Sequence, residues 1–170
     1  MRRSLTVLLA TILFVSCGGD EGADTFVRAT FDDKMWSAAA EEGTVVYSVD
    51  FPDGGGQIFT IASKVVGGGS QFISLNLPIP PAVGRYPLNG ATTNAVYASC
   101  PNDMLADCIY WSAVAEHPGT LTIDHVDPET GIIEGNFAFT GYALGDPAGS
   151  TKIFSGGHFR IYAPSVFTLE

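Results

Sequence analysis

Acidic side chains gather at one stretch of the sequence where they could bind a cation. Asp124, Asp127 and Glu129 fall within six positions. Ca²⁺ takes six to eight oxygen ligands, several of them carboxylates on one loop. The order of acids differs from that of an EF-hand, and Asp followed by Pro is also typical of a solvated β-turn. Two interpretations therefore stay open, a weak Ca²⁺ site and a plain turn, and no other cofactor is predicted.

Three histidines are the other side chains that could hold a metal. His117, His125 and His158 are far apart in the sequence, and their spacing neither supports nor excludes a shared site. A surface or hydrogen-bonded histidine is the commoner case. The known catalytic signatures are missing: the Gly-x-Ser-x-Gly elbow, His-Glu-x-x-His and a Gly-rich loop that ends in Lys-Ser/Thr. These absences favour a non-catalytic protein.

Aromatic residues beside Cys108 could form a binding surface. Tyr110 and Trp111 follow this cysteine closely, and Tyr97 precedes the cysteine loop. Exposed rings at such a place could form a platform for sugar rings or for a protein partner. Core packing of Trp111 is the alternative, because large aromatic side chains are usually well buried.

The first sixteen residues have the layout of a secretory leader. Arg2 and Arg3 precede an apolar run over residues 5–15, which is shorter than the ~20 residues of a membrane span. The segment 13–17 resembles the bacterial lipoprotein cleavage motif: Ser16 and Cys17 match it, and Phe14 replaces the usual Leu. The resemblance implies that Cys17 becomes an N-terminus carrying acyl chains such as palmitate. An ordinary secreted protein, with Cys17 incidental, is the alternative.

The remaining cysteines fit an exported protein. The chain has three cysteines, so acylation of Cys17 would leave Cys100 and Cys108 to pair. Disulfides persist outside the cytoplasm, and we expect this one. Two free or metal-binding thiols are the weaker alternative, because no further ligands stand at zinc-site spacing.

Composition and charge restrict the class of partner. Apolar residues make up 46% of the chain and charged residues 15%, which favours a folded protein. Loss of the leader would leave six basic and eighteen acidic residues, a net charge of −12. Such a protein repels phosphate backbones, so a nucleic acid partner is not expected. Residues 17–24 are acidic and glycine-rich, as a linker is.

The chain beyond residue 25 has the pattern of strands and turns. Short β-branched and aromatic segments, separated by Gly-rich turns at 54–56 and 67–69, recur as in a sandwich or barrel. Ile73, Leu75 and Leu77 share a face, and so do Ile133, Phe137 and Phe139. The same alternation places Leu121, Ile123 and His125 together. Residues 36–42 could form a helical turn or the end of a strand.

Consecutive hairpins are expected in the second half of the chain. Residues 96–99 and 109–113 flank the cysteine loop, and residues 120–126 turn through 127–131 into 132–143. A last strand over 152–162 follows the turn at 146–149. We therefore expect residues 25–170 to form one domain, an all-β antiparallel β-sandwich of about eight to ten strands.

Several segments in this order are similar to a family of uncharacterised bacterial β-sandwich lipoproteins. They are Phe26-x-x-Ala29-x-Phe31 with Trp36-Ser37-Ala38, Gly84-Arg85-Tyr86-Pro87-Leu88, the stretches 119–123 and 131–139, and Ser155-Gly156-Gly157-His158-Phe159. The resemblance spans residues 26–161 and implies fold and location. The family has no established activity to transfer.

We therefore expect a non-catalytic envelope or surface lipoprotein, lipid-anchored at the bacterial outer membrane on its periplasmic or cell-surface side. Its partner would be the membrane itself, together with a glycan or an envelope protein. A hydrolase acting on glycans is the alternative, and it requires two carboxylates at a set separation across a cleft. A carbohydrate-binding module stabilised by Ca²⁺ is the third interpretation.

Overall fold

The structure is a computed structural model that describes residues 24–39, 46–50, 57–89, 93–101, 108–144 and 149–163. These residues form eleven strands: β1 Phe26–Phe31, β2 Lys34–Ala39, β3 Val46–Asp50, β4 Gln57–Val66, β5 Gly69–Pro78, β6 Gly84–Leu88, β7 Asn94–Cys100, β8 Ile109–Ser112, β9 Gly119–Asp127, β10 Ile132–Ala143 and β11 Thr151–Tyr162. The expected all-β antiparallel fold is confirmed. No helix in the described part of the chain has the length and hydropathy of a membrane span.

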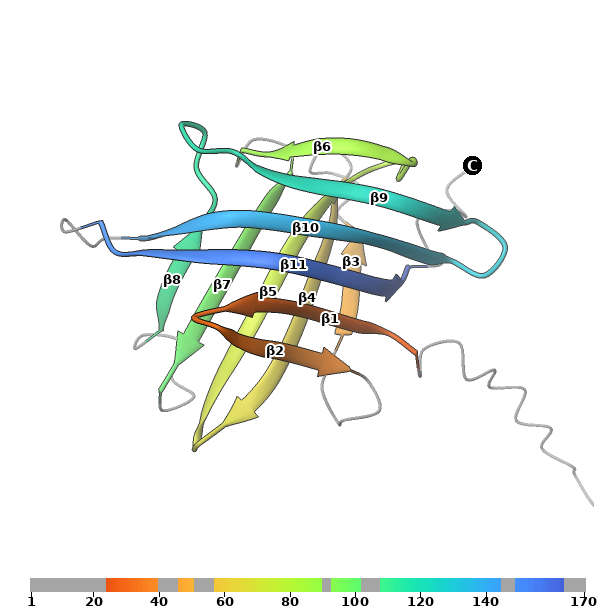
Figure 1. The fold of residues 1–170 in the computed structure, drawn as a ribbon. Helices are drawn as coiled ribbons and strands as arrows, with labels where there is room; N and C mark the ends of the chain where they lie inside the picture. The colour runs from red at the N-terminus through yellow and green to blue at the C-terminus, as the bar shows by residue number, and fades with distance from the viewer. Residues whose placement is uncertain are drawn as a thin grey trace, which may run out of the picture.

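One antiparallel sheet runs through the molecule and folds over on itself. Its main order is β2-β1-β11-β10-β8-β7-β5-β4-β3, and β9 and β6 extend from β10. The start of β10 pairs with β9, whereas its end pairs with β8 through Tyr142↔Ser112 and Ala143↔Trp111. Because β10 pairs with β9 at its start and with β8 at its end, the sheet divides there into two crossing layers (Figure 1). β2 contacts β4 and β11 contacts β3, so the sheet nearly closes into a barrel.

The core fills the space between the two layers. On β5, Ile73, Leu75 and Leu77 are fully buried, as the alternation predicted. On β10, Ile133, Phe137 and Phe139 point the same way and are buried too, which confirms the second expected face. Val27 and Ala29 of β1 and Phe154, Phe159 and Ile161 of β11 complete this core from the layer that contains β10. Burial of these alternate residues is what stabilises the two-layer arrangement.

Two glycines let β10 and β11 lie close together under aromatic rings. Gly135 of β10 lies opposite Phe159 of β11, and Gly157 of β11 lies opposite Phe137 of β10. A Cβ at Gly135 would lie 2.7 Å from the Phe159 ring, and one at Gly157 would lie 2.7 Å from the Phe137 ring. Each phenylalanine therefore covers the glycine across from it, an arrangement that suits a curved sheet.

Bulges bend the strands that must curve. β11 shifts register against both neighbours around Ser155 and Gly156, and Gly156 has a φ of 56° that glycine adopts without strain. A second shift leaves Asp124 of β9 as an extra residue, since His125 pairs with Glu134 and Ile123 with Gly135. The predicted face of Leu121, Ile123 and His125 is therefore wrong at His125. The extra residue turns His125 to the exposed side, while Leu121 and Ile123 stay buried.

The hairpin turns follow from their residues. Gly67 and Gly68, both with positive φ, join β4 to β5, and the turn expected at this glycine cluster is confirmed. The cluster at 54–56 lies outside the described residues. Asp32 and Asp33 join β1 to β2 with φ values of 50° and 57°, a conformation that Asp tolerates better than most residues. The segment from Trp36 is a strand, β2, up to Ala39 rather than a helical turn.

Candidate functional site

The main candidate site is a cavity of about 490 Å³ between the layers. It lies where the β1–β2 hairpin crosses the layer of β4, β5, β7 and β8 (Figure 1). Ligand pockets in proteins usually measure about 300–1,000 Å³, so the cavity has the size for a small molecule. Its lining comes from seven strands and the β1–β2 turn: Phe31, Asp32, Lys34, Met35, Trp36, Lys64, Val66, Gln71, Tyr97, Ser99, Trp111 and Lys152.

Aromatic rings form the walls of this cavity. The Tyr97 ring packs against two of the other lining rings, with centroid distances of 4.8 Å to Phe31 and 5.5 Å to Trp111. Trp36 and Tyr97 are 2% exposed and Trp111 is 8% exposed. Packing in the core therefore fixes the orientation of these rings before any ligand binds.

Two donors in the cavity wall are unsatisfied. The indole Nε1 atoms of Trp36 and Trp111 are buried without a hydrogen-bond partner. They are two of four such atoms in the described residues, and the other two lie elsewhere on Asn76 and Arg160. A buried donor without an acceptor costs about 1–3 kcal/mol. Both atoms lie within the packed core and present no surface to the cavity, so this cost is part of how the two rings are packed.

Lysines lie over the rings. The Lys152 Nζ is 5.2 Å from the Trp111 ring centroid and 5.5 Å from that of Phe31, and it forms an ion pair of 2.5 Å with Asp32. The Lys64 Nζ is 5.1 Å from the Trp36 centroid. Ammonium groups at such distances are attracted to the ring face. The third lysine of the chain, Lys34, also lines the cavity.

The surroundings of Tyr97 in the cavity lining raise the pKa of its phenol. Burial raises the pKa of its phenol, Asp32 adds to the rise by charge repulsion, and a hydrogen bond with Ser99 lowers it in part. The phenol therefore stays neutral and keeps its hydroxyl for hydrogen bonding. The described lining contains one carboxylate, Asp32.

Two of the three predicted ligand-binding aromatics lie in this cavity. Tyr97 and Trp111 line it as buried walls, not as an exposed platform. Tyr110 is on the opposite face of β8, where its ring meets the edge of Phe72 at 6.1 Å. The alternation along β8 explains this separation, because neighbouring side chains of a strand point to opposite faces.

Sequence reasoning missed the rest of the site. Phe31, Trp36 and the three lysines come from β1, β2, β4 and β11, parts of the chain that the long-range crossing of the two layers brings together. The one signal in the sequence was the rarity of two residue types: the chain has only two tryptophans and three lysines, and all five line this cavity.

The acidic cluster at 124–129 forms a capped turn. One carboxylate oxygen of Asp127 accepts hydrogen bonds from the backbone N–H groups of Glu129, at 2.9 Å, and Thr130, at 3.3 Å. The Thr130 side chain and these two N–H groups lower the pKa of Asp127. Asp124 accepts a hydrogen bond from Asn136 instead. No group of three metal-ligating side chains is present among the residues that the structure describes, so these acids are not brought together as ligands.

The three histidines lie apart. His117 stacks on Tyr142 with a centroid distance of 5.4 Å and borders a second, more open hollow of about 510 Å³ beside β10 and β11. His125 is exposed on β9. His158 is on the outer face of β11, 5.1 Å from the ring of Phe26.

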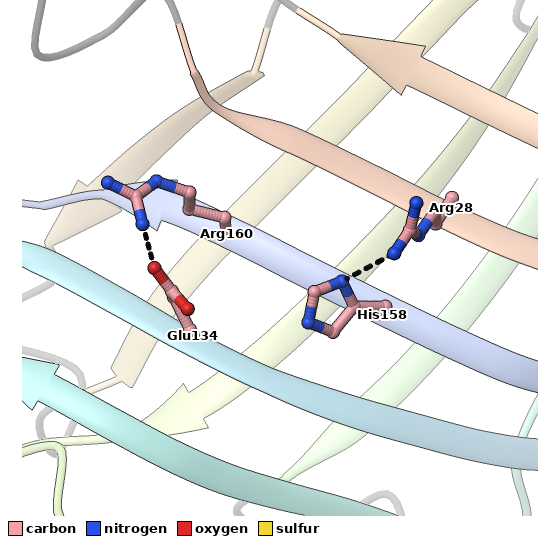
Figure 2. Close-up of polar contacts among 4 residues, drawn as sticks. All are labelled: Arg28, Glu134, His158 and Arg160. Atoms are coloured by element: carbon pink, nitrogen blue, oxygen red, sulfur yellow. Dashed lines mark hydrogen bonds and ion pairs between the residues drawn. The ribbon is translucent and has the colours of Figure 1, made fainter.

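The outer face around His158 carries a row of polar residues. Arg28 of β1, His158 of β11 and Asn136 of β10 are opposite one another on adjacent strands. Figure 2 shows the Arg28 guanidinium at the His158 ring, with 3.3 Å to its Nδ1. Two residues further along the same two strands, Arg160 of β11 donates a hydrogen bond to Glu134 of β10 (Figure 2). These residues form paired contacts on the outer face of the sheet, and neither of the two hollows described above includes them.

The predicted disulfide is present. Cys100 and Cys108 are bonded, and they close the loop between β7 and β8. The hairpin expected around this loop is confirmed by the pairs Tyr97↔Trp111 and Ser99↔Ile109. The bond therefore holds the two strands that carry two of the cavity walls. Cys17 lies outside the described residues.

Comparison of the chain with protein-family models, with curated proteins and with solved structures finds no match.

Proposed function

We propose that this chain is a lipid-anchored envelope protein that binds a small ligand without transforming it. The cavity between the layers is the binding site, and acylated Cys17 is the anchor at the bacterial outer membrane. The observation that carries the proposal is the cavity of about 490 Å³ itself, which is lined by both tryptophans and all three lysines of the chain. Fixed aromatic rings beside a few charged groups are typical of small-molecule sites.

The rest of the cavity supports binding. Its volume of about 490 Å³ suits a molecule of the size of a mono- or disaccharide. Its walls are rigid aromatic rings, and its polar groups are few and fixed in position, as in other small-molecule sites. The leader and the Ser16-Cys17 junction support the anchor.

The binding proposal can be tested with the protein's own fluorescence. Trp36 and Trp111 are the only tryptophans of the chain, so the indole emission reports on this cavity alone. We would titrate the full lipoprotein, purified in detergent, with a panel of neutral and acidic monosaccharides and disaccharides. The expected result is a saturable change in emission with at least one of them. A panel without any saturable change would contradict the proposal.

A matched pair of variants separates the cavity from the strand that carries it. Trp111→Phe replaces an indole ring of the cavity lining by a smaller ring, whereas Tyr110→Phe removes a hydroxyl from the next residue on the opposite face of β8. We expect at least fivefold weaker binding for Trp111→Phe, followed by calorimetry, and unchanged binding for Tyr110→Phe. Equal effects would mean that the change reports on β8 and not on the cavity.

The anchor is tested separately by the intact mass of protein purified from its native membrane. A mass that begins at Cys17 and includes acyl chains is expected. An unmodified mass that begins elsewhere would remove the anchor and leave the binding site as a property of a secreted protein.

A further inference from the structure

The sheet has a gap where β10 changes partners. β9 pairs with β10 as far as Ala138, and β8 pairs with it again only from Tyr142. Between these two residues, no described strand pairs with Thr140 on this edge of β10. The second hollow, of about 510 Å³, lies at this gap. Its lining consists of residues 116–120, 138–140 and 153–155.

The backbone N–H and C=O of Thr140 point into this gap. The Ala143 N–H donates to Ser150 on the side of β11, and the Leu144 N–H donates to Tyr110 of β8 on the other side. Because these groups point to alternate edges along a strand, those of Thr140 share the edge of Leu144. They therefore face the place where β8 and β9 separate (Figure 1).

Both residues that could pair with Thr140 are prevented from doing so. Continuation of the β9 register would bring Pro118 opposite Thr140, and proline has no N–H to donate. Continuation of the β8 register would bring Val114 there, but Val114 is paired with His117 and accepts a hydrogen bond of 3.2 Å from its N–H. Among the described residues, Thr140 therefore has no backbone partner across the gap. Such groups are satisfied by water or by a ligand when the chain supplies no partner.

The side chains around the gap suit an uncharged polar molecule. Glu116 and His117 belong to the segment before β9, whereas Thr140 and Ser155 belong to the outer face of β10 and β11. The His117 ring is supported by its stacking on Tyr142. The lining includes a carboxylate and no lysine or arginine. Because the whole chain is strongly acidic as well, an anionic ligand is repelled.

An exposed apolar patch lies beside these polar groups. Ile153 is 68% exposed, and Ala138 and Pro118 are also exposed. A hollow with both kinds of surface suits a ligand that has an apolar and a polar side, as a sugar ring has. An added peptide strand fits less well, because β9 and β8 close the gap at both ends and only residues 139–141 separate their pairings.

We propose that this hollow is a second binding site, which takes a neutral sugar residue with an acetamido group from a glycan. The acetamido oxygen accepts a hydrogen bond from the Thr140 N–H, and a neighbouring sugar hydroxyl donates to the Thr140 C=O. The acetamido methyl packs on Ile153, and further hydroxyls bond with Glu116 and Ser155. The site is separate from the cavity between the layers and does not depend on it.

NMR titration of the full lipoprotein in detergent, labelled with ¹⁵N, observes the Thr140 amide directly. N-acetylglucosamine and glucose are the two probes, since they differ only in the group at C2. N-acetylglucosamine should shift the Thr140 signal in a saturable way and bind about fivefold more tightly than glucose. An unmoved Thr140 signal, or equal affinity for the two sugars, would overturn the proposal. Movement of the indole signals of Trp36 and Trp111 alone would place the sugar in the cavity between the layers and would also overturn the second site.

Two variants test the gap and the side chains separately. Pro118→Ala supplies the missing N–H, so β9 can extend and pair with Thr140. It should weaken binding of N-acetylglucosamine about fivefold, as for one lost hydrogen bond, and protect the Thr140 amide from hydrogen exchange. Glu116→Ala should weaken binding by a similar factor without altering the strands. Pro128→Ala and Glu129→Ala, in the turn at the other end of β9, are the matched controls and should leave binding unchanged. Binding that Glu116→Ala leaves intact, or that the controls weaken equally, would contradict the site.

Discussion

His158 shows how one residue of the outer face links stability to pH. Burial lowers the pKa of this imidazole, Arg28 lowers it further by charge repulsion, and Asp124 opposes both. The neutral ring is therefore favoured in the folded protein, next to the Arg28 guanidinium at 3.3 Å. In the unfolded chain the same histidine takes up a proton near its ordinary value of about 6.5.

The free energy of unfolding should consequently fall as the pH drops below about 6.5, because the unfolded state then binds more protons at His158 than the folded state. The loss is small, under about 1 kcal/mol, since solvent screens this partly exposed group. Urea unfolding at pH 7.5 and 5.5 measures it, and His158→Gln should remove part of the difference. His125→Gln, at an exposed position on β9, serves as the control.

A pH difference of the same size in His158→Gln as in the parent protein would contradict this assignment. Asp127 does not interfere in this window. Its pKa is lowered by the hydrogen bonds of its turn, so the stability it contributes is lost only as the pH falls through and below about 3.8.

At the scale of elements, the glycines of β10 and β11 set how closely the strands and rings pack. A Cβ at Gly135 would lie 2.7 Å from the Phe159 ring and would also collide with the backbone oxygen of Thr122 at 2.1 Å. The Phe159 ring is fully buried in the core, and the Thr122 oxygen belongs to the backbone of the paired strand β9, so neither has much room to move.

Gly135→Ala should lower the free energy of unfolding by about 1–3 kcal/mol through overpacking. Gly84→Ala on β6 is the matched change, because a Cβ there meets only the Tyr86 side chain at an ordinary 3.5 Å. Its effect should stay within about 0.5 kcal/mol. Urea unfolding of the two variants gives the comparison, and similar values for both would argue against the close approach at Gly135.

Local patterns in the sequence were sufficient to predict most of the strands and turns. Alternation over Ile73, Leu75 and Leu77 predicted a buried face that the structure confirms. The turn at 127–131 followed from Asp-Pro and Gly, and Gly131 has the expected positive φ of 75°. His125 was placed on the wrong face because one extra residue at Asp124 reverses the alternation, and a count of period two does not reveal a bulge.

The cavity could not be predicted in the same way. Trp36 and Trp111 face one space because β2, β1 and β11 cross the layer of β8, β7 and β5. That crossing depends on where β10 changes partners, which is a property of long-range pairing. Tyr97 and Trp111 were identified as candidates through their closeness to the cysteine loop, but no local signal linked them to Lys64 or Lys152.

At the scale of the whole molecule, the disulfide stabilises the fold by restricting the unfolded chain. The bond between Cys100 and Cys108 closes a loop of nine residues, which corresponds to about 2.5 kcal/mol in the chain-entropy account. The double variant Cys100→Ser/Cys108→Ser should therefore unfold at a temperature lower by about 5–10 °C.

Calorimetry of the double variant measures this change, and a thiol assay of the unreduced parent protein should detect neither cysteine. Two reactive thiols without reduction would contradict the pairing. An unchanged unfolding temperature would mean that the loop is already restrained in the unfolded state.

The reciprocal arrangement of Gly135 with Phe159 and of Gly157 with Phe137 also limits how this sequence can diverge. Each glycine is acceptable because a ring covers it, and each ring fits because nothing projects from the residue opposite. A smaller residue in place of either ring would still leave the backbone oxygen of Thr122 against Gly135 and that of Phe137 against Gly157. In descendants of this chain both glycines should therefore persist even where the rings opposite them change.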